Sequence, residues 1–249
     1  MMSENLLMAV PLLFIVAALY SSVGHGGASG YLAVFSLIGV TMAPLVPVVL
    51  SLNILVASIS FLHFRKPGNF SFARLLPFII TSIPAAYVGG MWKLSGTAFS
   101  VVLGVALLSA GLRMFVVSPK LRSIPLEGWP LWRVALPIGL VLGLVSGMIG
   151  IGGGVFLSPI IIFLGLTDTK GSAAMSSAFI VLNSISGLVA KAPHIAIDPM
   201  IFGAFLLAGV CGALLGSNWG AFKSQARNLR FALGCVLIFA SVKLLAAAL

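Results

Sequence analysis

Apolar residues run through this 249-residue chain in ten stretches, separated by short polar or basic connections. The stretches do not alternate polar with apolar residues, as the strands of a membrane barrel do. The longer ones reach about 20 residues, the length that an α-helix needs to cross a bilayer. The pattern predicts helical segments at about 5–23, 30–40, 45–64, 75–92 and 97–117, and again at about 134–149, 154–166, 173–191, 201–220 and 231–249.

The composition identifies the surroundings of these segments. Only 7% of the residues are charged and 60% are hydrophobic, whereas a soluble domain has about 25% charged residues. This small number of charged residues cannot cover a water-facing surface. We therefore expect an all-α integral membrane protein with the lipid bilayer as its partner. The net charge of +10 lies mostly in the connections, where basic residues set orientation, and we expect no nucleic-acid partner.

The two halves of the chain match one another at an offset of 126 positions. Gly24 then falls on Gly150, and Gly90 falls on Gly216. The triplet 58–60 falls on 184–186, and a slip of four residues aligns Arg113 with Lys243. Internal repeats of this kind are common in transporters. The match predicts a first membrane repeat at 1–117, a cytoplasmic linker at 118–133 and a second membrane repeat at 134–249.

The second segment of each repeat is too short to cross a bilayer untilted. About 12 residues cover roughly 18 Å of a hydrocarbon core that is roughly 30 Å thick. These segments are therefore either re-entrant or part of an irregular crossing, and in both cases five segments invert one repeat relative to the other. Basic residues cluster at Arg65–Arg74, in the linker and at Lys223–Arg230. The positive-inside rule places these connections in the cytoplasm and both termini in the periplasm.

A glycine cluster interrupts each repeat just before its short segment, as VGHGGA in the first and IGIGGG in the second. Broken helices at membrane depth are tolerated where protein or a cavity satisfies the backbone, and paired breaks often form a substrate site near the midplane. The following helix would direct its N-terminus at that site and favour an anion. The alternative is close helix packing. The candidate substrate-binding residues are Ser22, Gly24, His25, Gly26, Gly27, Asn53, Ser146, Gly150, Gly152, Gly153, Gly154, Ser177 and Asn183.

Polar side chains near the glycine clusters could bind an anion or carry a proton. His25 either donates to an anion and couples a proton, or is held neutral by backbone carbonyls. Asn53 and Asn183 lie one helical turn apart when the repeats are aligned, so both can face the centre. The four acidic residues lie at segment ends or connections, which argues against a cation pump. The spacing of the histidines predicts no metal site, no cofactor is expected, and Cys211 and Cys235 are interpreted as packing residues.

The sequence SGMIGIGGGVFLSP at 146–159 resembles the second motif of the sulfite exporter TauE/SafE family, also called toluene sulfonate uptake permeases. The resemblance extends over nearly the whole chain, although His25 and Ala28 interrupt the first glycine run. It implies a permease for sulfite or small organosulfonates in the bacterial cytoplasmic membrane, and leaves import or export and the coupling ion open. The alternative is a membrane-embedded enzyme or assembly factor that uses a central cavity. The sequence shows no nucleophile, base and acid set, so transport is favoured.

Overall fold

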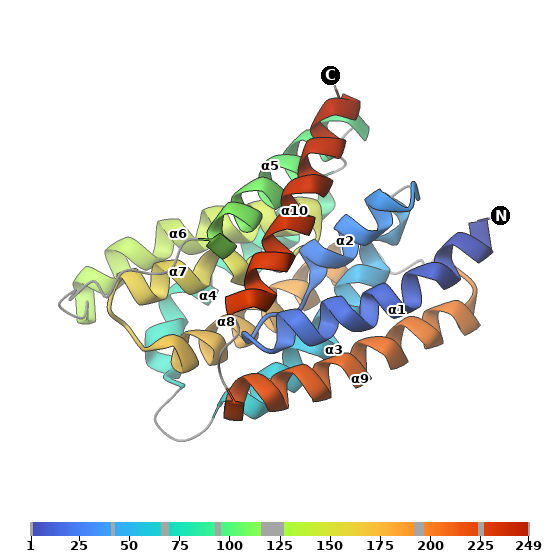
Figure 1. The fold of residues 1–249 in the computed structure, drawn as a ribbon. Helices are drawn as coiled ribbons and strands as arrows, with labels where there is room; N and C mark the ends of the chain where they lie inside the picture. Colours follow the sequence, from blue (N-terminus) through green and yellow to red (C-terminus); the bar gives the residue numbers. More distant parts are fainter. Residues whose placement is uncertain are drawn as a thin grey trace.

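The computed structural model describes residues 2–40, 43–65, 70–92, 96–115, 127–191, 197–223 and 227–248. These residues form ten α-helices and one short 3₁₀ turn (Figure 1). The helices of the first half are α1 (Met2–Ser21), α2 (Ala28–Leu37), α3 (Val46–Phe64), α4 (Phe72–Met91) and α5 (Gly96–Phe115), with the turn at Ala43–Leu45. Those of the second half are α6 (Gly128–Ile149), α7 (Gly154–Phe163), α8 (Thr169–Ala190), α9 (Pro199–Lys223) and α10 (Arg227–Ala248).

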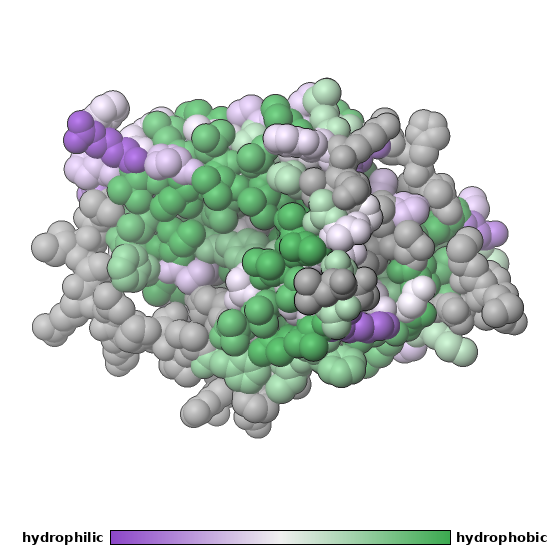
Figure 2. Space-filling model, turned by 90° about the horizontal axis from the view of Figure 1, so that it is seen from above, coloured by the Kyte–Doolittle hydropathy of each residue, from purple (hydrophilic) through white to green (hydrophobic). Residues whose placement is uncertain are grey.

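The predicted all-helical membrane fold is confirmed. In the described part of the chain, α3, α4, α6, α8 and most of α9 are long and apolar enough to cross a membrane. The short segments are present as α2 and α7, each with ten residues, which is about 15 Å of helix. One described face of the molecule is covered mainly by apolar residues, with hydrophilic residues in small groups (Figure 2). Cys211 and Cys235 are exposed rather than packed inside the bundle.

Several helices begin about one turn before the apolar segments that predicted them. Helix α6 starts at Gly128, inside the range that we assigned to the linker, and its Pro130 lies in the first turn, where a missing N–H is tolerated. Helix α8 starts at Thr169 because the Asp168 carboxylate caps it, accepting from the Gly171 N–H at 2.8 Å. A hydropathy pattern detects only the apolar part of a helix and leaves out these polar first turns.

The duplication is repeated in the backbone. Helices α2 and α7 begin 126 positions apart and end 126 positions apart. Three glycine pairs at the same offset have left-handed φ angles: Gly24 and Gly150 (both 78°), Gly27 and Gly153 (99° and 72°), and Gly39 and Gly165 (76° and 68°). Side chains other than glycine rarely adopt this conformation. The repeated glycines therefore specify the same chain path in both halves.

Glycine rows hold two parallel helix pairs close together. Gly139, Gly143 and Gly147 of α6 leave no room for a Cβ against the backbone of α4 at Phe78, Ser82 and Ala86. A corresponding row on α9, at Gly212, Gly216 and Gly220, faces the backbone of α1 at Phe14, Ala18 and Ser22. Small residues four positions apart allow such close approach in membranes. These glycines serve packing between helices.

Two further pairs join corresponding helices of the halves. On α3 and α8, Asn53 contacts Ser184 while Leu50 lies near Gly187, so the helices run antiparallel. On α5 and α10, Ser241 donates to the Gly104 carbonyl at 2.7 Å while Gly234 lies near Gly111, which is also an antiparallel register. Figure 1 shows α5 and α10 side by side, with both termini toward the upper right of the molecule.

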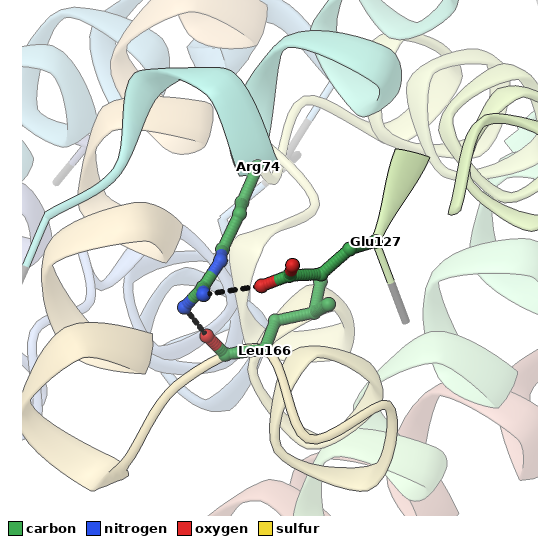
Figure 3. A network of polar contacts seen from close by, with 3 residues as sticks. All are labelled: Arg74, Glu127 and Leu166. Atoms are coloured by element: carbon green, nitrogen blue, oxygen red, sulfur yellow. Dashed lines mark hydrogen bonds and ion pairs between the residues drawn. The ribbon is translucent and has the colours of Figure 1, made fainter. Parts of the chain in front are cut away.

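Basic side chains bind the carbonyl ends of the short helices. The Lys243 ammonium donates to the Ser36 and Leu37 carbonyls, at 2.7 and 3.1 Å, at the end of α2. Arg74 donates to the Leu166 carbonyl just after α7 and pairs with the Glu127 carboxylate at 2.9 Å (Figure 3). Cations at helix C-termini stabilise the negative end of the helix dipole. The opposite ends of α2 and α7, which carry the positive end of the helix dipole, lie at the glycine breaks.

We expect the substitution Lys243→Met to lower the free energy of unfolding by about 0.5–1 kcal/mol, because the last carbonyls of α2 lose a charged donor. Thermal unfolding of the purified protein in detergent measures this change. Lys243→Arg keeps the charge and serves as the control. A methionine variant as stable as the parent protein would show that the contact with α2 contributes nothing.

Candidate functional site

The two breaks end in helix N-termini whose N-cap residues are glycines. The chain leaves α1 at Ser21 and enters α2 at Ala28, and it leaves α6 at Ile149 and enters α7 at Gly154. The N-cap residues Gly27 and Gly153 are both left-handed, and neither N-cap forms a side-chain hydrogen bond. The first N–H groups of a helix have no acceptor within the helix. At each N-terminus these donors depend on groups outside the N-cap residue, because glycine has no side chain to accept from them.

Asn53, in the middle of α3, lies between the two breaks and contacts both. Its Oδ1 accepts from the Ala28 N–H at 3.2 Å, in the first turn of α2. Its Nδ2 donates to the Ser184 hydroxyl at 2.8 Å and, at 3.5 Å, to the Ile151 carbonyl in the second break. The side chain is only 1% exposed. Asn53 is thus the amide that links the halves at the predicted site.

The approach of Asn53 explains why two of the break residues are glycines. A Cβ at Gly26 would collide with Asn53 Oδ1. A Cβ at Gly152 would lie 2.6 Å from Asn53 Nδ2 and 2.7 Å from Ser184 Oγ. Gly152 also has a φ of 71°, whereas Gly26 does not have a positive φ. Gly26, Gly152 and Asn53 are therefore brought together, as the sequence predicted for a shared site.

His25 joins the first break to the second repeat through a chain of hydroxyls. Its Nε2 lies 2.8 Å from the Ser158 hydroxyl on α7, which lies 2.7 Å from the Ser176 hydroxyl on α8. Ser172 donates to the Ser158 carbonyl at 3.0 Å. The Ser158 hydroxyl also contacts the Gly154 carbonyl at 3.2 Å. Ser158 is 133 positions from His25 in the sequence, so this pair is brought together only by the fold.

A comparison of the two repeats could have indicated this hydrogen-bonded group of His25, Ser158 and Ser176. The positions that correspond to His25, Ser158 and Ser176 at the 126-residue offset are Ile151, Leu32 and Leu50. Three polar residues thus replace three apolar ones, and in the structure they contact one another. The two breaks are therefore chemically different although their backbones match. Ser158 was not among the predicted site residues, because a single serine in an apolar helix does not by itself indicate a site.

Two buried tyrosines hold the first break in place. The Tyr31 hydroxyl donates to the Gly26 carbonyl at 2.9 Å, and the Tyr20 hydroxyl lies 2.7 Å from the Ser29 hydroxyl. Both rings are almost completely buried. A Cβ at Gly27 would lie 2.7 Å from the Tyr31 ring, so this glycine makes room for the ring that fixes its neighbour. Neither tyrosine had been predicted as part of the site.

The remaining serines bond within their own helices. The hydroxyls of Ser22, Ser146 and Ser177 donate to the carbonyls of Leu19 at 2.7 Å, Gly143 at 3.0 Å and Ala173 at 2.7 Å. Such bonds satisfy a buried hydroxyl without a ligand.

Gly24 and Gly150, the first glycines of the two breaks, approach side chains other than Asn53. A Cβ at Gly24 would collide with Ala173 of α8, and one at Gly150 would collide with Val46 of α3. These two glycines therefore allow close packing of the breaks against α8 and α3, and neither contacts Asn53.

Asn183 is buried on α8. Its Nδ2 donates to the Phe179 carbonyl at 2.8 Å. Its Oδ1 has no hydrogen-bond partner among the described residues. The Phe179 ring packs beside Gly153, where a Cβ would be 3.1 Å from the ring. Asn183 therefore differs from Asn53, since it leaves one strong acceptor unused.

The side chain of Lys191, the residue that follows α8, reaches the end of α6, immediately before the second break. The Lys191 ammonium is 3.4 Å from the carbonyls of both Gly90 and Met148, near the C-terminal ends of α4 and α6. Partial burial lowers the pKa of Lys191 from its usual value. No group of three or more His, Cys, Asp or Glu side chains in the described ranges could hold a metal ion.

Comparison with known proteins identifies the family. The family model described as sulfite exporter TauE/SafE matches residues 9–244. The chain belongs to the TauE/SafE family. A relative from Sinorhizobium fredii, named probable membrane transporter protein y4hK, is 32% identical over 234 residues, covering 93% of this chain and 95% of that protein. No solved structure matches the chain. TauE/SafE membership, the transporter relative and the apolar helices together indicate a multi-pass membrane transporter.

Proposed function

We propose that this protein transports a small sulfur-containing anion, such as sulfite or an organosulfonate, which binds between the two glycine breaks. The observation that carries the proposal is the meeting of the two glycine-capped breaks at Asn53, whose amide accepts from the first N–H of α2 and contacts the Ile151 carbonyl in the second break. Backbone donors at a helix N-terminus bind oxyanions without a cationic side chain. The description of the matched family, sulfite exporter, agrees with that chemistry.

In the proposed mechanism, Asn53 marks the place where the anion binds. Its amide accepts from the Ala28 N–H and donates to Ser184 Oγ. An oxyanion that displaces the amide oxygen would accept from the same backbone donor. The closely packed glycines Gly26 and Gly152 leave no space for both groups, so binding requires the breaks to separate. Such a separation would couple anion binding to a change between conformations.

The proposed topology is a pair of inverted repeats in the cytoplasmic membrane, with both termini in the periplasm. Antiparallel packing of α3 with α8, and of α5 with α10, supports the inversion. The pair Arg74 and Glu127 joins the starts of α4 and α6. The cluster of Phe64, Ala173 and Ala221 joins the end of α3 to the end of α9. These contacts between the described ends of the basic connections support their assignment to one side of the membrane, as the positive-inside rule requires.

Single cysteines test this topology. Because Cys211 and Cys235 are both exposed, they are first replaced by serine. Met200→Cys, at a site that is 85% exposed at the start of α9, is expected to react with a membrane-impermeant maleimide added to spheroplasts. Ala73→Cys, at an exposed site in the first turn of α4, is expected to react only after lysis. Labelling of the Ala73 variant from outside would contradict the orientation.

Substrate-dependent flux tests the function itself. The purified protein is reconstituted into liposomes and assayed with sulfite, thiosulfate, sulfoacetate and taurine, against empty liposomes. We expect flux of at least one of these compounds, and competition by the others that share its site. Absence of flux with all four, in vesicles that hold folded protein, would overturn the proposed substrate class.

A further inference from the structure

The first break holds a buried titratable side chain that the proposed mechanism does not use. His25 is 7% exposed, and of the three histidines in the chain it is the one that lies inside a glycine break. Histidine is the side chain whose ordinary titration falls between about pH 5 and 8. Ionisable groups inside membrane proteins are costly and often mark proton pathways. The His25 site is therefore a candidate for binding a proton.

The contacts of the His25 ring continue into two serine hydroxyls of the other repeat. Its Nε2 lies 2.8 Å from Ser158 Oγ, which lies 2.7 Å from Ser176 Oγ and 3.2 Å from the Gly154 carbonyl oxygen. Ser158 has a single hydroxyl hydrogen, so it donates to one of these three groups at a time. The direction of the hydrogen bonds therefore depends on whether Nε2 carries a hydrogen.

Both protonation states of the ring can be hydrogen-bonded in this arrangement. When Nε2 has no hydrogen, Ser158 donates to it and can accept from Ser176. When Nε2 carries a hydrogen, as it does in the imidazolium, Ser158 accepts from the ring and can donate to Ser176 or to the Gly154 carbonyl. Rotation of the hydroxyl groups is therefore enough to accommodate the gain or loss of a proton.

The two states of the ring differ in charge, and the hydroxyls do not balance that charge. Ser158 and Ser176 are neutral and buried. Gly24, beside His25, packs so closely against α8 that a Cβ would collide with Ala173. A buried charge is costly unless it is paired or solvated. The imidazolium therefore gains from any rearrangement that lets water reach the ring.

The elements that meet around the first break carry few other ionisable side chains, and α7 carries none. Helix α9 is included because Gly220 packs against the Ser22 carbonyl. The Lys170 ammonium donates to the Ala221 carbonyl at 3.2 Å. In this set, only His25 and His63 ordinarily change charge between about pH 5 and 8, which makes His63 the matched control. The other ionisable residues are Glu4 and Tyr20 on α1, Tyr31 on α2, Lys170 on α8, and Cys211 and Lys223 on α9.

We propose that His25 is the proton-binding site of this transporter and that one proton moves with each substrate anion, in the same direction. This inference rests on the proposed function, in which anion binding separates the breaks. The same separation would let water reach the imidazolium, and the imidazolium would attract the anion. Proton and anion thus favour the same conformation, so each raises the affinity for the other. Ile151 stands at the corresponding position of the second break, so the site belongs to the first break alone.

Proton coupling is measured as accumulation of substrate against its concentration gradient. The purified full-length protein is reconstituted into liposomes at about pH 6.5 outside and about pH 7.5 inside, with potassium and valinomycin holding the membrane potential near zero. Thiosulfate, sulfoacetate and taurine hardly change charge over this range. One proton per anion allows up to roughly tenfold accumulation for one pH unit. We expect at least roughly fivefold accumulation of a transported compound, against none in protein-free liposomes.

Two results in the parent protein separate this inference from the proposed function. Transport to equal concentrations on both sides, without accumulation, would overturn proton coupling and leave the proposed anion transport standing. Absence of transport with these three compounds and with sulfite would overturn the proposed function and this inference with it. Sulfite itself titrates in this range, so its accumulation counts only as the excess over that in a variant without the His25 ring.

Two histidine variants locate the proton site. His25→Gln keeps a polar group for Ser158 but does not titrate, and is expected to bring the steady-state ratio within roughly twofold of unity, whatever its rate of transport. His63→Gln removes a ring whose Nδ1 lies 2.9 Å from the Ile59 carbonyl of its own helix, and is expected to accumulate substrate as the parent does. Accumulation that survives in His25→Gln would exclude His25 as the proton site. His25→Asn carries the same expectation where the glutamine variant does not fold.

Discussion

Replacing Gly152 with alanine is expected to reduce sulfite affinity by roughly a hundredfold or more, which corresponds to about 2.7 kcal/mol. The new Cβ would lie 2.6 Å from Asn53 Nδ2 and 2.7 Å from Ser184 Oγ, the two groups that join α3 and α8 at the breaks. Gly152→Val enlarges the same obstruction. Affinity is measured on purified, monodisperse protein.

Gly39→Ala provides the matched control for this variant. Gly39 has a φ of 76°, close to the 71° of Gly152, but nothing lies within 4 Å of a Cβ built there. The control therefore reports the cost of a left-handed alanine alone, about 1 kcal/mol of stability. We expect it to bind sulfite as the parent protein does. If folded Gly152→Ala also kept its affinity, the glycines of the second break would serve packing and not anion binding.

Much of the fold could be predicted because a membrane protein shows its helices in hydropathy. The short helices α2 and α7 were visible from the glycines before them, since left-handed turns need glycine. The start of α6 was misplaced because Trp129, Pro130 and Arg133 give its first turns little continuous hydropathy. Charge placement suggested the inversion, and the register of Ser241 against Gly104 supports it.

The site was less predictable, because its contacts join positions far apart in the sequence. The sequence suggested Asn53 and Gly152, but could not show that their close approach also involves Ser184. Ser158 lies 133 positions from its partner His25, and hydropathy treats it as one polar residue in an apolar run. Conversely, Ser177 looked available for a ligand but bonds its own helix. The direction in which a serine hydroxyl points depends on the fold, and the identity of the residue does not predict it.

Asn53→Asp is expected to give a folded protein with sulfite affinity reduced at least roughly thirtyfold, equivalent to about 2 kcal/mol. The carboxylate can accept from the Ala28 N–H and from the Ser184 hydroxyl, which already contact the amide. It would place a negative charge at the N-terminus of α2, which stabilises that helix. The variant would thereby carry a tethered anion at the proposed site and repel a second one.

Asn53→Leu separates this electrostatic effect from loss of the amide. Leucine has nearly the same shape but leaves the Ala28 N–H and the Ser184 hydroxyl without their partner. We expect its free energy of unfolding to fall by about 2–3 kcal/mol, because buried polar groups lose their bonds. The aspartate variant should remain closer to the parent protein in stability while binding anions more weakly. We therefore expect the aspartate variant to be the more stable of the two and the leucine variant to bind sulfite more tightly.

Asn218→Asp is the charge-matched control for Asn53→Asp, since Asn218 is exposed on α9. It adds the same charge to the protein and is expected to change sulfite affinity by less than roughly twofold, because Asn218 is not among the groups that contact Asn53. Sulfite affinity retained in folded Asn53→Asp would mean that the anion binds away from Asn53. A loss of equal size in Asn218→Asp would attribute the effect to net charge. Only a loss confined to position 53 places the anion where α2, α3 and the second break meet.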